Sequence, residues 1–244
     1  ISVGVMYYAA LVPCVLAAFI AQGISSALGL ESTHFVVDEI ASFSLINGSK
    51  FIIMSILFAL ASILLCVVLH GTSKLYTDYI NNPYIRIIIA GALVIAMRYI
   101  FGTTDYLGAG SDIIARSFVT SCAWYVFLLK MLFTAVTLGG GFKGGEIVPT
   151  FFIGASFGCL FGTLTGFSPT LCAAIGMAAI FCGVTNSPIT SLLISFEMFG
   201  FAAMPFLLLA IAFSYMLSGY YGLYRSQKIM YSKFKTSYIN KQTH

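Results

Sequence analysis

Long apolar runs separated by short polar segments make up most of the chain. Several runs reach the roughly 20 residues that a helix needs to cross a bilayer. A membrane β-barrel would instead show short segments of alternating polarity. The pattern therefore predicts an all-α integral membrane protein, with polar connections at 31–47 and 71–83. Helices are expected at residues 6–28, 51–69, 85–101, 117–137, 150–163, 171–184, 188–198 and 206–217.

A glycine-rich stretch, residues 139–149, interrupts this pattern between two of the predicted helices. It holds five glycines within seven residues, together with Lys143 and Glu146. Each glycine costs a helix about 1 kcal/mol relative to alanine, so a helical break is expected. Broken backbone and ionisable residues at membrane depth are tolerated where they are buried in protein or line a watery cavity. A new helix starting at Ile147 would present its positive end to this gap, which suits an anion.

Smaller features predict how the helices pack and begin. Asp105 and Asp112 are expected to cap helices, and Ser187 to cap a helix whose first residue is Pro188. Small residues spaced every fourth position let two helices approach closely, and the run at 150–163 carries such a ridge at Gly154, Gly158 and Gly162.

Composition agrees with a membrane protein and argues against several other classes. The chain is 59% hydrophobic and 8% charged, whereas soluble domains carry roughly 25% charged residues. The six cysteines lie singly and the three histidines are scattered, so neither disulfides, a metal site nor another cofactor is expected. An intramembrane hydrolase is a weak alternative, because Ser111 follows glycines but no helical histidine can serve as its base. We predict no enzyme.

Basic residues gather at the end of the chain, after the last acidic residue, Glu197. By the positive-inside rule this segment is expected in the cytoplasm. We therefore divide the chain into a transmembrane region, 1–224, and a basic cytoplasmic tail, 225–244. No folded basic domain accompanies the tail, so nucleic-acid binding is not expected. The basic residues are Arg225, Lys228, Lys233, Lys235 and Lys241.

The sequence Gly144-Gly145-Glu146-Ile147-Val148-Pro149 resembles the anion-coordinating G-x-F-x-P signature of the CLC family of chloride channels and proton-coupled exchangers. The longer stretch G-G-G-F-K-G-G-E, residues 139–146, is closer to the fluoride-exporting branch. Ile147 stands where the family usually has an aromatic residue, and the acidic Glu146 precedes it; both argue against simple chloride selectivity. Residues 176–198 also resemble a CLC segment that contributes to the dimer face.

A tyrosine near the end of the protein completes the anion site in this family. Its G-x-x-x-L-Y pattern matches residues 219–224, which assigns the role to Tyr224. The hydroxyl of Tyr224 would then point at the ion. The alternative is an interfacial aromatic belt, because Tyr220 and Tyr221 lie close by, next to basic residues.

By this resemblance, the ion is held by the backbone amides of Gly145, Glu146 and Ile147, with the Tyr224 hydroxyl opposite. An ionised Glu146 would repel the anion, whereas a protonated one would donate a hydrogen bond to it. Glu146 is therefore a candidate for coupling proton and anion movement. Alternatively, Lys143 keeps Glu146 ionised as a structural partner. The sequence leaves both options open.

The resemblance covers essentially the whole chain, but only the C-terminal, inverted-repeat half of a CLC protomer, a bundle of broken helices. The gating-glutamate motif of the first half is not found in this sequence. We expect a fragment, a split gene product or one of two subunits, in the cell membrane, with a homodimer and an N-terminal half as partners. The predicted function is chloride or fluoride transport, by conduction or proton-coupled exchange. Alternatives are a non-conducting structural or regulatory half-subunit and another broken-helix secondary transporter.

Overall fold

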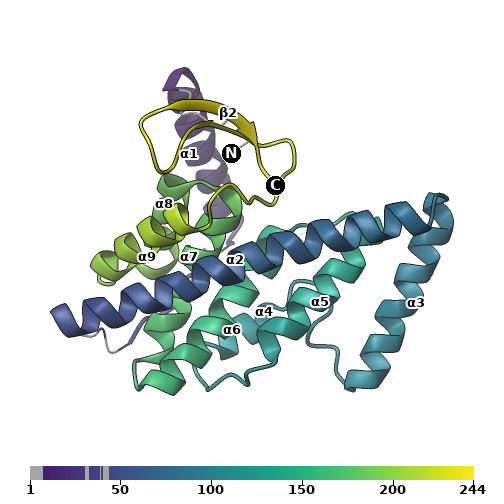
Figure 1. The fold of residues 1–244 in the computed structure, drawn as a ribbon. Coiled ribbons are helices and arrows are strands. Elements are labelled where there is room, and N and C mark those ends of the chain that lie inside the picture. The colour runs from purple at the N-terminus through teal and green to yellow at the C-terminus, as the bar shows by residue number, and fades with distance from the viewer. Residues whose placement is uncertain (1–7, 31–32, 39, 41–43) are drawn as a thin grey trace.

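The computed structural model describes residues 8–30, 33–38, 40 and 44–244, which form a helical bundle with one β-hairpin (Figure 1). Four helical segments among them are long and apolar enough to cross a membrane: Tyr8–Ala27, Leu45–Tyr79, Pro83–Phe101 and Ile147–Thr165. The predicted all-helical membrane fold is confirmed. The elements are η1 (Tyr8–Ala10), α1 (Leu11–Ala27), α2 (Leu45–Tyr79), α3 (Pro83–Phe101), α4 (Ser111–Arg116), α5 (Val126–Gly139), α6 (Ile147–Thr165), α7 (Pro169–Thr185), α8 (Pro188–Phe199), α9 (Met204–Leu217), β1 (Lys228–Tyr231) and β2 (Tyr238–Gln242).

Helix α7 is the centre of the bundle. All of its residues from Thr170 to Thr185 are buried, and it packs against α2, α6, α8 and α9. A helix that is apolar on every side needs such an all-round cover. The long helix α2 crosses the whole molecule in Figure 1, with α3 and α5 toward one end and α7, α8 and α9 toward the other.

The glycine ridge of α6 lies against α7, as close helix packing requires. A Cβ atom added to Gly158 would lie 2.1 Å from the carbonyl oxygen of Cys172. One added to Gly154 would lie 2.6 Å from the carbonyl oxygen of Gly176. Backbone therefore touches backbone along this pair, and the prediction of close packing by Gly154, Gly158 and Gly162 is confirmed.

Three predicted helix boundaries are wrong. Helix α2 begins at Leu45, before the predicted start at residue 51. Helix α2 continues through the polar residues 71–79, where the hydroxyls of Thr72 and Thr77 donate to the carbonyls of Val68 (2.7 Å) and Ser73 (2.6 Å) one turn earlier. The helix predicted at 117–137 begins only at Val126. The hydroxyls of Ser117 and Thr120 donate to carbonyls of α4, those of Ile113 and Arg116, so these residues follow the end of α4 and do not start α5. The predicted start of the first helix at residue 6 lies outside the described residues.

The predicted caps are only partly correct. Gly110 is the N-cap residue of α4 and Asp112 lies in its first turn, so Asp112 caps nothing. Asp105 is not a cap either: its amide donates to the hydroxyl of Thr103. Ser187 does precede α8 with Pro188 at the first position, but its side chain makes no capping bond. It bonds to the Thr185 hydroxyl instead, at 2.7 Å.

Residues 225–244, predicted only as a basic tail, fold back onto the bundle. Strands β1 and β2 pair antiparallel, with Tyr231 opposite Tyr238. In Figure 1 this hairpin lies at the same end of the molecule as α8. The amide of His244 donates to the carbonyl of Tyr220 at 3.0 Å, which closes the segment onto the turn after α9. The tail is therefore part of the fold.

Candidate functional site

The break between α5 and α6 is built by glycines at the positions where side chains would not fit. Gly141 has a φ of +104°, which disfavours residues with a Cβ atom. A Cβ atom on Gly140 would lie 2.1 Å from the Cβ atom of Ala90. At Gly145, in contrast, an added Cβ atom would meet nothing within 4 Å. Helix α6 begins at Ile147, as predicted.

The start of α6 carries backbone amides without partners. The amide of Thr150 is the first to bond into the helix, to the carbonyl of Glu146 at 3.2 Å. Among the described residues, the amides of Gly145, Glu146 and Ile147 donate to no protein group. Glu146 occupies the N-cap position, and its side chain makes no capping bond. These three donors remain available to a ligand at the positive end of the helix.

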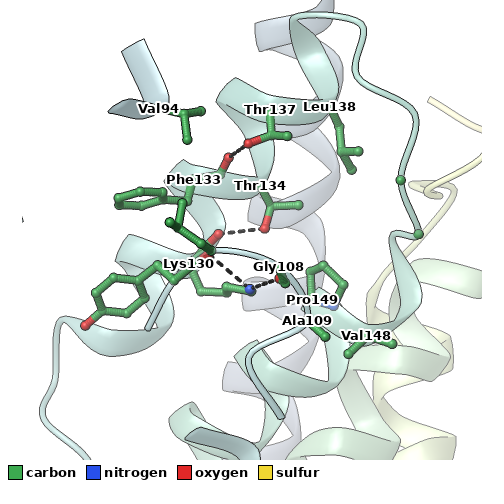
Figure 2. A pocket seen from close by; sticks show the side chains of 14 residues that line it. Val94, Gly108, Ala109, Lys130, Phe133, Thr134, Thr137, Leu138, Val148 and Pro149 are labelled. Atoms are coloured by element: carbon green, nitrogen blue, oxygen red, sulfur yellow. Dashed lines mark hydrogen bonds between the residues drawn. The ribbon is translucent and has the colours of Figure 1, made fainter. Parts of the chain in front are cut away.

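Two of the cavities at this helix start are lined by the residues just before it, Gly145 and Glu146. The larger, of about 430 Å³, is lined by Gly144, Gly145 and Pro149 on one side and by residues of α5 on the other (Figure 2). The smaller, of about 200 Å³, is lined by Glu146 together with residues of α2 and of the segment after α9. Gly145 and Glu146 thus line different cavities at the start of α6.

Lys130 lies at the wall of the larger cavity and is 1% exposed. Its Nζ donates to the carbonyls of Gly108 (2.7 Å) and Tyr106 (3.2 Å) and lies 4.9 Å from the centre of the Phe152 ring. Figure 2 shows this side chain reaching across to the Gly108 loop. All its partners are neutral, so its charge adds positive potential next to the start of α6. Its only signal in the sequence is a lone cation in an apolar run, and no role was predicted for it.

Glu146 is half-buried and lines the smaller cavity together with His70 and Arg225. The described residues contain no ion pair between Glu146 and Lys143, whose side chain is exposed. Arg225 lies on the cavity wall because its Nη2 donates to the carbonyl of His70 at 3.0 Å. Arg225, which was predicted only as part of the tail, therefore lines the same cavity as Glu146.

The structure brings Tyr224 into the same region. Its neighbours along the chain, Leu223 and Arg225, line the cavity of Glu146, and Tyr224 itself is half-buried against the main hydrophobic core. Tyr221, in contrast, is 36% exposed, and the Tyr220 hydroxyl bonds to Ser232 in the hairpin at 3.0 Å. The three tyrosines thus have different surroundings within the protein.

Comparison with known proteins gives concordant matches. Residues 2–219 match the family described as voltage gated chloride channel. A chloride/fluoride channel protein of Pseudomonas syringae pv. tomato is 33% identical over 239 residues, which cover 96% of this chain and 53% of the relative. An uncharacterised protein of Methanocaldococcus jannaschii is 31% identical over 157 residues, 60% of this chain and 39% of that protein.

Among solved structures, the fold is similar to the crystal structure of a CLC-type fluoride/proton antiporter. The TM-score is 0.88 at 29% sequence identity, and the match covers 92% of this chain and 57% of the antiporter chain. The chain therefore spans a little more than half the length of the curated relative from Pseudomonas and of this structure.

Proposed function

The chain belongs to the voltage gated chloride channel family, and we propose that it forms part of a protein that carries a halide ion, chloride or fluoride, across a membrane. We place fluoride first, because the Pseudomonas relative and the similar crystal structure both have fluoride in their descriptions. Transport proceeds by channel conduction or by exchange with protons. The family's members are transporters, and an enzymatic activity is not part of this proposal.

The observation that carries the proposal is that the amides of Gly145, Glu146 and Ile147 at the start of α6 have no partner among the residues that the structure describes. Amides suit an anion because they provide donors without a competing cation. The Tyr224 hydroxyl supplies a further donor, supported by the position of its neighbours Leu223 and Arg225 on the wall of the Glu146 cavity. Fluoride is strongly hydrated, so several donors are needed to offset the loss of its water.

Glu146 links this site to protons. A carboxylate next to a bound anion is repulsive, whereas the protonated carboxyl donates a hydrogen bond to it. The half-buried position of Glu146 and the absence of an ion pair with Lys143 among the described residues favour this role over a structural one. Glu146 then exchanges a proton as the anion enters or leaves.

The complete protein requires more than this chain. No side chain of α1 is buried, and Ala90 is the only buried residue of α3, so both helices need lipid or further protein around them. We propose an N-terminal half as partner, a homodimer, and a cell-membrane location with residues 225–244 in the cytoplasm. The alternative is a non-conducting half-subunit, favoured by the same partial coverage of the relatives.

Ion efflux from liposomes tests the proposal. Vesicles are loaded with fluoride or chloride and contain the intact protein, that is, this chain together with its proposed N-terminal half. They should release the ion, as followed with an ion-selective electrode. Tyr224→Phe should slow release and weaken binding by about 0.5–3 kcal/mol, the range for one hydrogen bond to a neutral or charged group.

Tyr221→Phe is the matched control for this measurement and should leave release unchanged. Equal effects at the two tyrosines would contradict the anion role of Tyr224. No release of either ion by the intact protein would contradict transport itself and favour the non-conducting subunit.

A further inference from the structure

Lys233, in the loop between β1 and β2, ties the C-terminal hairpin to the helical bundle. Its Nζ donates to the carbonyl of Tyr215 at 2.8 Å and to the Ser218 hydroxyl at 3.1 Å. It also donates to the side-chain oxygen of Asn186. All three ammonium protons can therefore be used, and the charge lies 4.4 Å from the centre of the Tyr215 ring.

The partners of Lys233 lie at the C-terminal ends of two helices. Tyr215 is in the last turn of α9, and Asn186 is the residue that ends α7. Helix C-termini carry partial negative charge, which favours a cation there. Burial nevertheless lowers the pKa of Lys233 to about 8, because the ammonium loses water and gains only neutral acceptors. The titratable groups that face it are the thiols of Cys66 and Cys182 and the phenol of Tyr215, which are ordinarily uncharged at neutral pH.

Asn186 passes this connection on to the turn that carries Tyr224. Its φ of +54° places it in the left-handed region. While its side-chain oxygen accepts from Lys233, its Nδ2 donates to the carbonyl of Tyr221 at 2.9 Å and to Oε1 of Gln227 at 3.2 Å. The amide side chain of Asn186 thus joins the hairpin loop to Tyr221, which precedes Tyr224 in the chain, and to Gln227, which follows it.

The backbone of Tyr224 is held by the same segment. Its carbonyl accepts from the amide of Gln227 at 2.9 Å and from the hydroxyl of Thr243, in the segment after β2, at 2.7 Å. On the other side, the amide of Leu223 donates to the carbonyl of Val184 at 2.8 Å. The position of Tyr224 therefore depends on the docked hairpin.

We propose that Lys233 and Asn186 are positioning residues for the anion site, which fix the turn at 221–224 so that the Tyr224 hydroxyl faces the ion. This inference rests on the proposed contact between Tyr224 and the anion. A donor helps a small ion only when it is held at hydrogen-bond distance, so a loosened turn weakens binding without removing any group that touches the ion.

Fluoride titration of the intact protein by calorimetry tests this inference. Lys233→Met should weaken fluoride binding about tenfold, comparable to losing one hydrogen bond to a charged group. Asn186→Gly should do the same, because glycine tolerates the left-handed backbone and only the amide side chain is lost. Lys235→Met removes an exposed charge from the same loop and should leave binding unchanged.

The decisive measurement combines Lys233→Met with Tyr224→Phe. If Lys233 acts through the Tyr224 hydroxyl, the double variant should bind fluoride within about twofold of Tyr224→Phe alone, since coupled residues are not additive. A further tenfold loss in the double variant would show that Lys233 only supports the fold and would overturn the inference. If Lys233→Met does not fold, Asn186→Gly is combined with Tyr224→Phe in the same comparison.

The two proposals fail in different ways. Tyr224→Phe without effect on fluoride binding would overturn the anion role of Tyr224, and with it the premise of the positioning role. A clear effect of Tyr224→Phe together with unchanged binding in Lys233→Met and Asn186→Gly would overturn the positioning role alone.

Discussion

Gly158→Ala tests the close backbone contact between α6 and α7. The added Cβ atom would lie 2.1 Å from the carbonyl oxygen of Cys172 and 2.9 Å from the Cα atom of Ala173. Carbon and carbonyl oxygen in favourable contact lie at about 3.3 Å or more. Because the clashing atoms belong to the backbone of α7, no change of side-chain rotamer can relieve them. Helices α6 and α7 must separate by about 1 Å.

This separation is costly because helix association in a membrane depends on close packing rather than on water release. A gap of about 0.5–1 Å forfeits a quarter to a half of the dispersion energy of each contact along the pair. Overpacked cores usually lose about 1–3 kcal/mol. With backbone on both sides and no rotamer to yield, we expect Gly158→Ala to lower the free energy of unfolding by about 3 kcal/mol.

Equilibrium unfolding in mixed micelles of mild detergent and dodecyl sulphate, followed by helical circular dichroism, measures this change. Gly71→Ala is the matched control, because Gly71 lies within α2 and a Cβ atom there would meet nothing within 4 Å. Alanine in place of a helical glycine should stabilise the protein by about 0.5–1 kcal/mol. If Gly158→Ala unfolds within about 0.5 kcal/mol of the wild type, the backbone contact between α6 and α7 does not exist.

Three further predictions concern charged groups. Glu146→Gln keeps a donor and loses the titration, so fluoride binding measured by calorimetry from pH 5 to pH 8 should stay strong and lose its pH dependence; unchanged pH dependence would make Glu146 a structural residue. Lys130→Met leaves the carbonyls of Tyr106 and Gly108 without their donor and should lower thermal stability by about 1–3 kcal/mol, whereas Lys143→Met, at an exposed site, should not. Because the pKa of Lys233 falls from 10.5 to about 8 on burial, the docked hairpin binds fewer protons, so its protection from proteolysis should rise between about pH 8 and pH 10.5. Lys233→Met should abolish this rise.

The sequence was sufficient to predict the helices whose pattern is dictated by burial. Helices α3, α6, α7 and α9 begin and end within three residues of the predicted runs, because long apolar segments in a membrane have no alternative to helix. The helix bounds in segments with several Ser and Thr residues were harder to predict. Thr72 and Thr77 stay within α2, whereas Ser117 and Thr120 bond back to the end of α4, and nothing local in the sequence distinguishes the two cases.

The candidate site was predicted only where a motif is contiguous. The break before Ile147 follows from glycines next to one another, so it was found. Lys130 was missed as a site residue because its acceptors are backbone carbonyls 22 and 24 residues away. Lys233 was assigned to a solvated tail, although its partners lie 15, 18 and 47 residues earlier in the chain. Contacts between residues so far apart in the chain leave no local pattern in the sequence.

The charges around the break determine what the proposed site can bind. The start of α6, the Lys130 ammonium and Arg225 each contribute positive potential, and among the described residues neither of the two side chains forms an ion pair. Glu146 is the acid at the same place. When Glu146 is ionised, an entering anion brings the site to two negative charges. When Glu146 is protonated, the bound anion is the single negative charge of the two groups. Proton and anion therefore favour each other's binding, and by linkage each strengthens the other by the same factor. The proposed site therefore predicts that the binding of proton and anion is interdependent, with Glu146 as the residue that links them.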